Sequence, residues 1–133
     1  MNKKEIKRIF NAGRHSVTSK YTFEKWYETY DISVEEIASF YEICFKSVLD
    51  MKASKCLNRR LGFCSELKHI IRHVVYTKLD HITYEIISEA ERLAGSHKSP
   101  HHSTIVNSMK EVSNGNVSDV LLKRVQKLSK QYL

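Results

Sequence analysis

The sequence predicts an all-α protein of about six or seven helices. Apolar residues recur three and four positions apart along most of the chain, as they do on one face of a helix, and the two-residue alternation of strands is hard to find. One proline and four glycines in 133 residues leave few turn signals. A chain of this length is enough for one ordinary domain with its own core. We therefore expect helices joined by short connections.

A helical arm, residues 1–31, is expected ahead of a main domain at residues 32–133. Its first helix is short and basic and ends at Gly13. The apolar face of that helix consists of Ile6, Ile9 and Phe10. A second helix, residues 22–30, carries four aromatic residues at helical spacing: Phe23, Trp26, Tyr27 and Tyr30. We interpret these rings as core or as the surface on which the arm docks, and a platform for stacking bases is the alternative. The arm is also a candidate for dimerisation or for binding a protein partner.

A capping box marks the start of the main domain. Ser33-Val34-Glu35-Glu36 places a hydroxyl and a carboxylate where they satisfy backbone N–H groups at a helix start. An apolar face follows, in one or two helices, and residues 52–60 then form a basic stretch without periodicity. Ser65 can cap the next helix, with Lys68 and Arg72 on its polar side. The apolar face of this helix consists of Leu67, Ile70, Ile71, Val74 and Val75.

Two short helices farther along, residues 84–94 and 100–113, are joined by a brief polar connection. Gly95 suits the position after the first helix, because glycine readily takes the left-handed conformation there. Ser99-Pro100 is typical of an N-cap followed by the first helical residue. Such a pair is typical of a helix-turn-helix, and a last amphipathic helix, residues 118–132, follows it. The residues of these three helices that we expect to face inward are Ile86, Ile87, Ala90, Leu93, Ile105, Val106, Met109, Val112, Val120, Leu121, Val125, Leu128 and Tyr132.

The second of these helices begins with small polar side chains. In a helix-turn-helix, the start of the recognition helix enters the major groove and meets base edges. The candidates for base contact are His101, His102, Ser103, Thr104 and Asn107. Thr104 offers a methyl group to thymine, and Asn107 can pair with adenine through two hydrogen bonds. A helix N-terminus also favours a nearby phosphate. Lys98, Ser99 and Lys110 flank this surface, so they are candidates for contacts to the DNA backbone.

The charge balance points to a polyanionic partner. The formal net charge is +7, which favours association with phosphates. Apolar runs are too short for a membrane span, so no membrane partner is expected. Cys44, Cys56 and Cys64 lack Cys-x-x-Cys spacing, and we interpret them as small buried hydrophobic residues. Their odd number and the lack of a signal peptide indicate a reducing compartment, so we expect a cytoplasmic, nucleoid-associated protein.

The start of the recognition helix resembles a known DNA-binding signature. The run His101-His102-Ser103-Thr104-Ile105-Val106-Asn107-Ser108-Met109-Lys110 is similar to the signature of the C-terminal DNA-binding domain of the bacterial replication initiator DnaA. That family has Asp-His-Thr/Ser-Thr-Val/Ile there, followed by a short helix with a basic residue. The order of elements over residues 32–133 also follows the family, from its first helices through a basic loop to its closing helix. The resemblance implies a TrpR-like fold that binds a short, defined duplex box.

By this resemblance, the recognition helix reads the major groove and the basic loop reaches the neighbouring minor groove. His102, Ser103 and Thr104 would read or position against bases, and Arg59, or else Arg60, would enter the minor groove. The resemblance and the charge together assign phosphate contacts to Lys55, Lys68 and Arg72.

Three features depart from the family pattern. Pro100-His101 stands where the family has Arg-Asp, so an imidazole replaces an acidic acceptor for cytosine. Cys56-Leu57-Asn58 stands where the family is richer in arginine, and the connection between the two helices is longer. These departures bear on the family's recognition sequence more than on its fold.

No enzymatic activity, nucleotide, cofactor or metal is expected. The sequence has no Gly-x-x-x-x-Gly-Lys-Ser/Thr motif for nucleotide phosphates. His69 and His73 lie four residues apart near Glu66 but lack the His-Glu-x-x-His pattern, so we interpret them as structural. Arg92 and His97 match the Arg-x4-His spacing of the helical HEPN ribonucleases, which is the enzyme alternative. A basic helical protein-interaction module is the third alternative.

These observations together predict a sequence-specific double-stranded-DNA-binding protein that reads the major groove with a helix-turn-helix. We expect it to act in the control of replication or transcription. A phage or mobile-element protein and a host regulator both fit this description.

Overall fold

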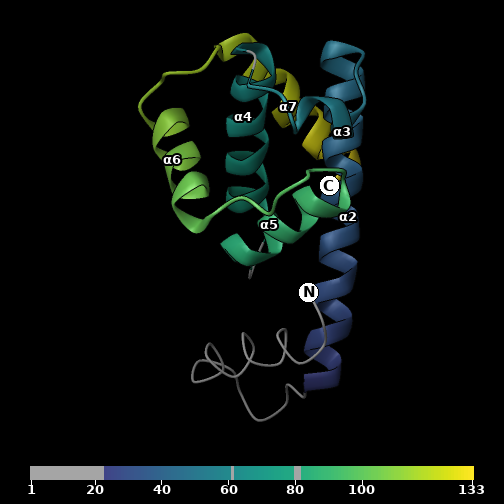
Figure 1. The fold of residues 1–133 in the computed structure, drawn as a ribbon. Coiled ribbons are helices and arrows are strands. Elements are labelled where there is room, and N and C mark those ends of the chain that lie inside the picture. Colours follow the sequence, from purple (N-terminus) through teal and green to yellow (C-terminus); the bar gives the residue numbers. More distant parts are fainter. Residues whose placement is uncertain (1–22, 61, 80–81) are drawn as a thin grey trace. The chain divides into compact units, whose positions relative to one another are not determined.

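The computed structural model describes residues 23–60, 62–79 and 82–133, with side chains from residue 33 onward. This part of the chain contains six helices and no strand, which confirms the all-α prediction (Figure 1). The helices are α2 (Phe23–Leu49), α3 (Ala53–Cys56), α4 (Gly62–Lys78), α5 (Tyr84–Leu93), α6 (His102–Ser113) and α7 (Asp119–Tyr132). Within the described ranges, none of them combines the length and apolarity needed to span a bilayer. The predicted first helix of the arm and the aromatic side chains of residues 23–30 lie outside what the structure describes.

The chain divides into two compact units, Met1–Ser33 and Val34–Leu133. Helix α2 crosses the boundary without a break, so the prediction that Ser33 caps a new helix is wrong. Residues 23–49 contain neither glycine nor proline, and nothing in that segment interrupts the backbone hydrogen bonds of the helix. The helix ends at Leu49, and the next residue, Asp50, has a φ of 52° in the left-handed region that aspartate tolerates better than most residues.

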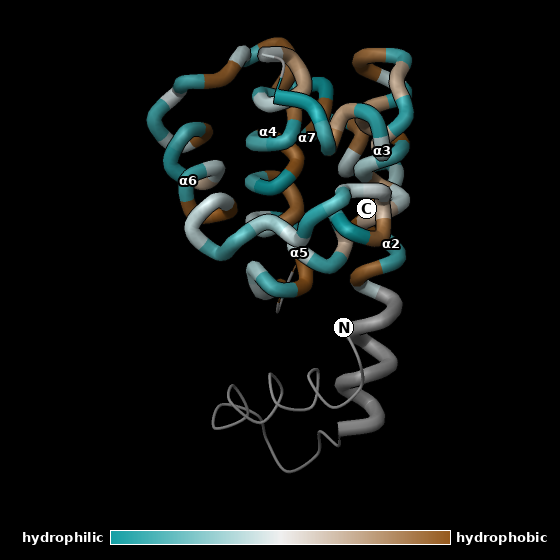
Figure 2. Tube along the Cα trace, viewed as in Figure 1, coloured by the Kyte–Doolittle hydropathy of each residue, from teal (hydrophilic) through white to brown (hydrophobic). Residues whose placement is uncertain are grey.

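Helix α4 lies at the centre of the unit Val34–Leu133. It packs against α5, α6 and α7 (Figure 1). Its predicted apolar face is buried throughout, and Phe40, Tyr41 and Phe45 of α2 are fully buried as well. Figure 2 shows the same pattern, with hydrophobic positions recurring along the helices between hydrophilic ones. Each large apolar side chain that leaves water stabilises the fold by about 1.5–3 kcal/mol. The buried side chains of α2 and α4 therefore form a stable core on which α5 and α6 pack.

Local signals set the helix ends in the second half of the chain. The hydroxyl oxygens of Thr83 and Ser118 accept hydrogen bonds from backbone N–H groups in the first turns of α5 and α7, at 3.3 and 3.4 Å. Gly95 follows α5 with a φ of 122°, as predicted for a glycine in this position. Gly115 follows α6 in the same way, with a φ of 74°. Both glycines allow the chain to turn away after the last helical residue.

Some predicted positions differ in the structure. Helix α4 begins at Gly62, so Ser65 lies inside its first turn and is not its cap. Leu93, Val120 and Tyr132 were expected to face inward but are exposed. Each of the three lies in the first or last turn of its helix, where fewer neighbouring side chains cover the surface.

Candidate nucleic-acid interface

Helices α5 and α6 form a pair that rests on α4 and is linked by residues 94–101. The end of α5 is a Schellman motif: the Gly95 N–H donates to the Arg92 carbonyl at 3.1 Å, and the Ser96 N–H donates to the Glu91 carbonyl at 3.0 Å. The hydroxyl of Ser88 donates to the carbonyl of Pro100 at 2.9 Å. The connection therefore leaves α5 at a defined angle and is tied back to α5 just before α6 begins.

The start of α6 lies two residues later than predicted. His101, not Ser99, is the N-cap: its Nδ1 accepts a hydrogen bond from the Ser103 N–H at 3.1 Å, and its backbone is extended. Pro100 lies before the cap instead of in the first turn, because its carbonyl is held by α5. Lys98 and Ser99 remain exposed in the connection.

The five predicted base-contact residues are all exposed at the start of α6: His101, His102, Ser103, Thr104 and Asn107. Lys110, one turn farther along, is exposed too. The opposite face of α6 is anchored by Ile105, Ser108 and Val112, which are buried. The helix thus turns a row of short hydrogen-bonding side chains outward and leaves its first turn open to a partner.

An aromatic group supports the first turn of α6. The ring of Tyr84, at the start of α5, stacks on Tyr76 of α4 with 5.0 Å between ring centroids. The imidazole of His102 meets Tyr84 edge-on, at 4.5 Å and 88°. Edge-to-face contacts of this kind are favourable for aromatic rings. The sequence pattern did not reveal this group, because its three members are distant along the chain.

The basic stretch contains a helical turn, α3, that the sequence analysis did not predict. The Glu42 carboxylate accepts a hydrogen bond from the Ala53 N–H at 2.8 Å. The residues that anchor the turn are Ala53, Cys56 and Leu57, all buried. Their spacing of three and four residues was the available signal. Lys55 and Arg60 are exposed and Arg59 is half-buried, so the stretch presents cations on its outer side.

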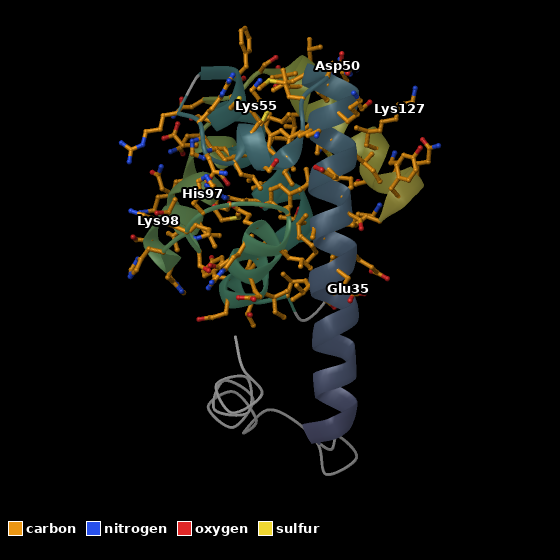
Figure 3. The ribbon with its side chains drawn as sticks, turned by 45° about the vertical axis from the view of Figure 1, so that its right-hand side comes forward. Glu35, Asp50, Lys55, His97, Lys98 and Lys127 are labelled. Carbon is orange, nitrogen blue, oxygen red and sulfur yellow. The ribbon has the colours of Figure 1, made fainter. Side chains whose placement is uncertain are left out.

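Asn58 joins this basic turn to the connection between α5 and α6. Its Nδ2 donates to the carbonyls of Ser54 at 2.5 Å and Gly95 at 2.9 Å, and its Oδ1 accepts the His97 N–H at 2.7 Å. Figure 3 shows His97 and Lys98 on one side of the unit and Lys127 of α7 on the other. Sequence reasoning missed Asn58, since nothing local indicates a partner 37 residues away.

Arg72 is buried, which corrects the prediction that it contacts phosphate. Its Nε and Nη2 donate to the two carboxylate oxygens of Glu91 at 2.6 and 2.8 Å. The Tyr41 hydroxyl donates to the same carboxylate at 2.6 Å. This fully paired site explains how the charge of Arg72 leaves water.

The Arg72 network extends into α6. Its Nη1 donates to Ser108 Oγ at 3.0 Å, and His69 Nδ1 lies 2.7 Å from the same oxygen. Burial lowers the pKa of Arg72, but hydrogen bonds and attraction to Glu91 outweigh burial, so the pKa is raised. Burial, followed by repulsion from Glu91, raises the pKa of Tyr41. The guanidinium stays charged and ties α4, α5 and α6 together.

Lys68, the other predicted phosphate contact on α4, is half-buried. Its ammonium donates to the Arg59 carbonyl at 3.1 Å, and burial lowers its pKa. Lys68 therefore stabilises the backbone of the basic turn through this hydrogen bond.

Histidines, cysteines and acidic residues in the described ranges form no group of three that could hold a metal ion. The pKa of His69 is lowered by burial and by Arg72, and that of His73 by burial. The Nδ1 atom of His73 is buried without a hydrogen-bond partner. Both rings thus belong to the packing of α4.

The three cysteines are buried and unpaired, which confirms their interpretation as small hydrophobic residues. Burial raises the pKa of Cys44 to about 12, which keeps that thiol protonated. Arg92 and His97, the two residues of the ribonuclease alternative, are exposed in the last turn of α5 and in the connection after it.

No family model, curated protein or solved structure matches the sequence.

Proposed function

We propose that this protein binds double-stranded DNA in a sequence-specific manner, with the start of α6 in the major groove. One observation carries the proposal. The exposed polar start of α6 and the cationic α3 turn are attached to the same connection, so one duplex can meet both. Base edges are read by short polar side chains at close range, and phosphates position the protein through cations beside them.

The charges around this connection favour a phosphate backbone. Residues 51–60 and 94–104 contain five cationic residues and no aspartate or glutamate: Lys52, Lys55, Arg59, Arg60 and Lys98. A polyanion that lies across both segments is attracted by the cations of each. The positive end of the α6 helix dipole lies at this turn and adds a further preference for anions.

The proposed role is control of replication or transcription, by likeness to the C-terminal DNA-binding domain of DnaA. The support is the run His101–Lys110 together with the order of helices, and a TrpR-like fold belongs to the same proposal. His101 uses its Nδ1 to cap α6, so it does not replace the acidic residue with which that family accepts a hydrogen bond from cytosine. We therefore expect a target that differs from the family's box at this position.

A matched pair of lysine variants tests the proposal. Lys98 and Lys127 are both exposed, on opposite sides of the unit (Figure 3). Lys98→Ala should weaken binding to every duplex alike and reduce the slope of log affinity against log salt by about 1. Lys127→Ala makes the same change in net charge and should leave affinity and slope close to those of the unaltered protein. Equal effects of the two substitutions in a fluorescence-anisotropy titration would contradict a defined DNA-binding face.

A further inference from the structure

The contacts of Asn58 point beyond simple loop packing. Its carboxamide makes three hydrogen bonds, to the carbonyls of Ser54 and Gly95 and from the N–H of His97. All three partners are backbone atoms, so the contact depends on Asn58 alone among side chains. The reversed amide would face its NH2 group toward an N–H and its oxygen toward two carbonyls, which fixes the orientation.

The backbones that Asn58 joins lie unusually close together. A Cβ atom added to Gly95 would lie 2.5 Å from Ser54 Cβ and 2.7 Å from Ser54 Cα. Glycine is therefore required at residue 95 both for its φ of 122° and for this approach. The absence of a Cβ at Gly95 allows the α3 turn and the α5–α6 connection to approach this closely. The three hydrogen bonds of Asn58, which we call the clasp, hold the two segments in that position.

The clasp joins two cationic segments. Lys55, Arg59 and Arg60 belong to the segment that carries Asn58, and Lys98 belongs to the connection between α5 and α6. By fixing the two backbones against each other, the clasp fixes where these side chains are attached relative to one another.

We propose that Asn58 is a positioning residue for duplex binding. It holds the segment that carries Lys55, Arg59 and Arg60 at a fixed position relative to the start of α6, so that both contact one DNA duplex. The inference rests on the proposed function. Asn58 itself need not touch DNA, because its polar atoms are engaged with backbone. The start of α6 is held by Ser88, the His101 cap and Tyr84, and the α3 turn is held by its buried Ala53, Cys56 and Leu57. Loss of the clasp should therefore leave both parts folded but shift the α3 turn against the connection, which weakens phosphate contacts and leaves base reading in place.

A double-mutant cycle on the whole chain tests this inference. The variants are Asn58→Ala, the double substitution Lys55→Ala/Arg60→Ala, and all three changes together, each titrated with 30-base-pair duplexes at several salt concentrations. Asn58→Ala should flatten the salt slope by about as much as removing the two cations, about 2. The triple variant should be no weaker than the cation variant. Ser54→Ala keeps the backbone carbonyl that Asn58 uses, so it is the matched control and should bind normally.

The outcomes separate this inference from the proposed function. If the unaltered protein binds duplexes but the effects of Asn58→Ala and of the cation variant simply add, Asn58 is structural only and the inference is wrong. If the unaltered protein shows no salt-dependent duplex affinity, the proposed function fails and the inference with it. Urea unfolding of each variant shows whether it is folded. If Asn58→Ala does not fold, Asn58→Gln replaces it in the cycle, since one extra methylene misplaces the same polar atoms.

Discussion

Arg72 and Glu91 form a buried ion pair whose two partners lie 19 residues apart on α4 and α5. Such a pair contributes little beyond what apolar residues would contribute, but breaking it leaves one charge uncompensated. Glu91→Gln removes the negative charge and leaves the guanidinium in place. We expect the free energy of unfolding to fall by about 3–5 kcal/mol.

The control for this prediction is Glu85→Gln on the same helix. Glu85 is exposed, so its loss should change the free energy of unfolding by less than about 0.5 kcal/mol. Urea denaturation of the two variants checks the pair. Similarly small losses of unfolding free energy for both variants would show that the buried Arg72 charge does not depend on Glu91.

The histidines of α4 make stability depend on pH. The pKa of His69 and His73 lies below the ordinary value of 6.5 in the folded chain, mainly because burial disfavours the imidazolium. The unfolded chain therefore binds more protons in this range, so the free energy of unfolding should fall as the pH drops below 6.5. His73→Leu should flatten this decline in urea titrations at a series of pH values. A decline unaffected by His73→Leu would contradict the assignment.

At the scale of helices and turns, two glycines make a natural comparison. Gly95 and Gly115 both follow a helix with positive φ, but only Gly95 would bring a Cβ against Ser54. Gly115→Ala should cost about 1–2 kcal/mol, from backbone strain alone. Gly95→Ala combines the collision with a φ of 122°, which lies farther from the left-handed region that L residues tolerate, and should cost clearly more, as measured by thermal or urea unfolding. Equal costs would mean that the α3 turn moves away freely and is not fixed against the connection.

Elements with local causes were predictable from the sequence, and those with distant causes were not. The apolar face of α4, the ends of α5 at Gly95 and the separate α6 follow from spacing within a few residues. Ser33 and Ser65 look like caps, but a cap forms only where the helix is interrupted, and neither site is. Arg72 has the spacing of a surface residue, and only its partners Glu91 and Ser108 on other helices explain its burial.

The candidate interface divides along the same line. The exposure of His102, Thr104 and Asn107 follows from the helical periodicity of α6, which buries Ile105 and leaves these three residues on its outer side. The attachment of the basic turn to the connection does not, because Asn58 meets backbone atoms far along the chain. Periodicity indicates which side of a helix is buried, but it carries no information on which loop lies beside it.

At the scale of the unit Val34–Leu133, a rigid support underlies a polar surface. Helix α4 carries the Arg72 network, which links it by hydrogen bonds to α2, α5 and α6. The start of α6 and the α3 turn are both fixed to this support. Sequence readout requires such preorganisation, because short side chains meet base edges only when the helix is held at the right depth.

Selection of bound duplexes from a random pool, at about 150 mM salt where weak non-specific contacts are partly suppressed, tests the central claim most directly. We expect the unaltered protein to recover one short motif, and Thr104→Ala to lose preference at one or two of its positions, at a cost of about 1–3 kcal/mol on the selected site. Recovery of no motif, with binding lost at that salt, would contradict sequence-specific recognition. Attention would then turn to a non-specific binder, an interaction module, or RNA cleavage that depends on Arg92 and His97.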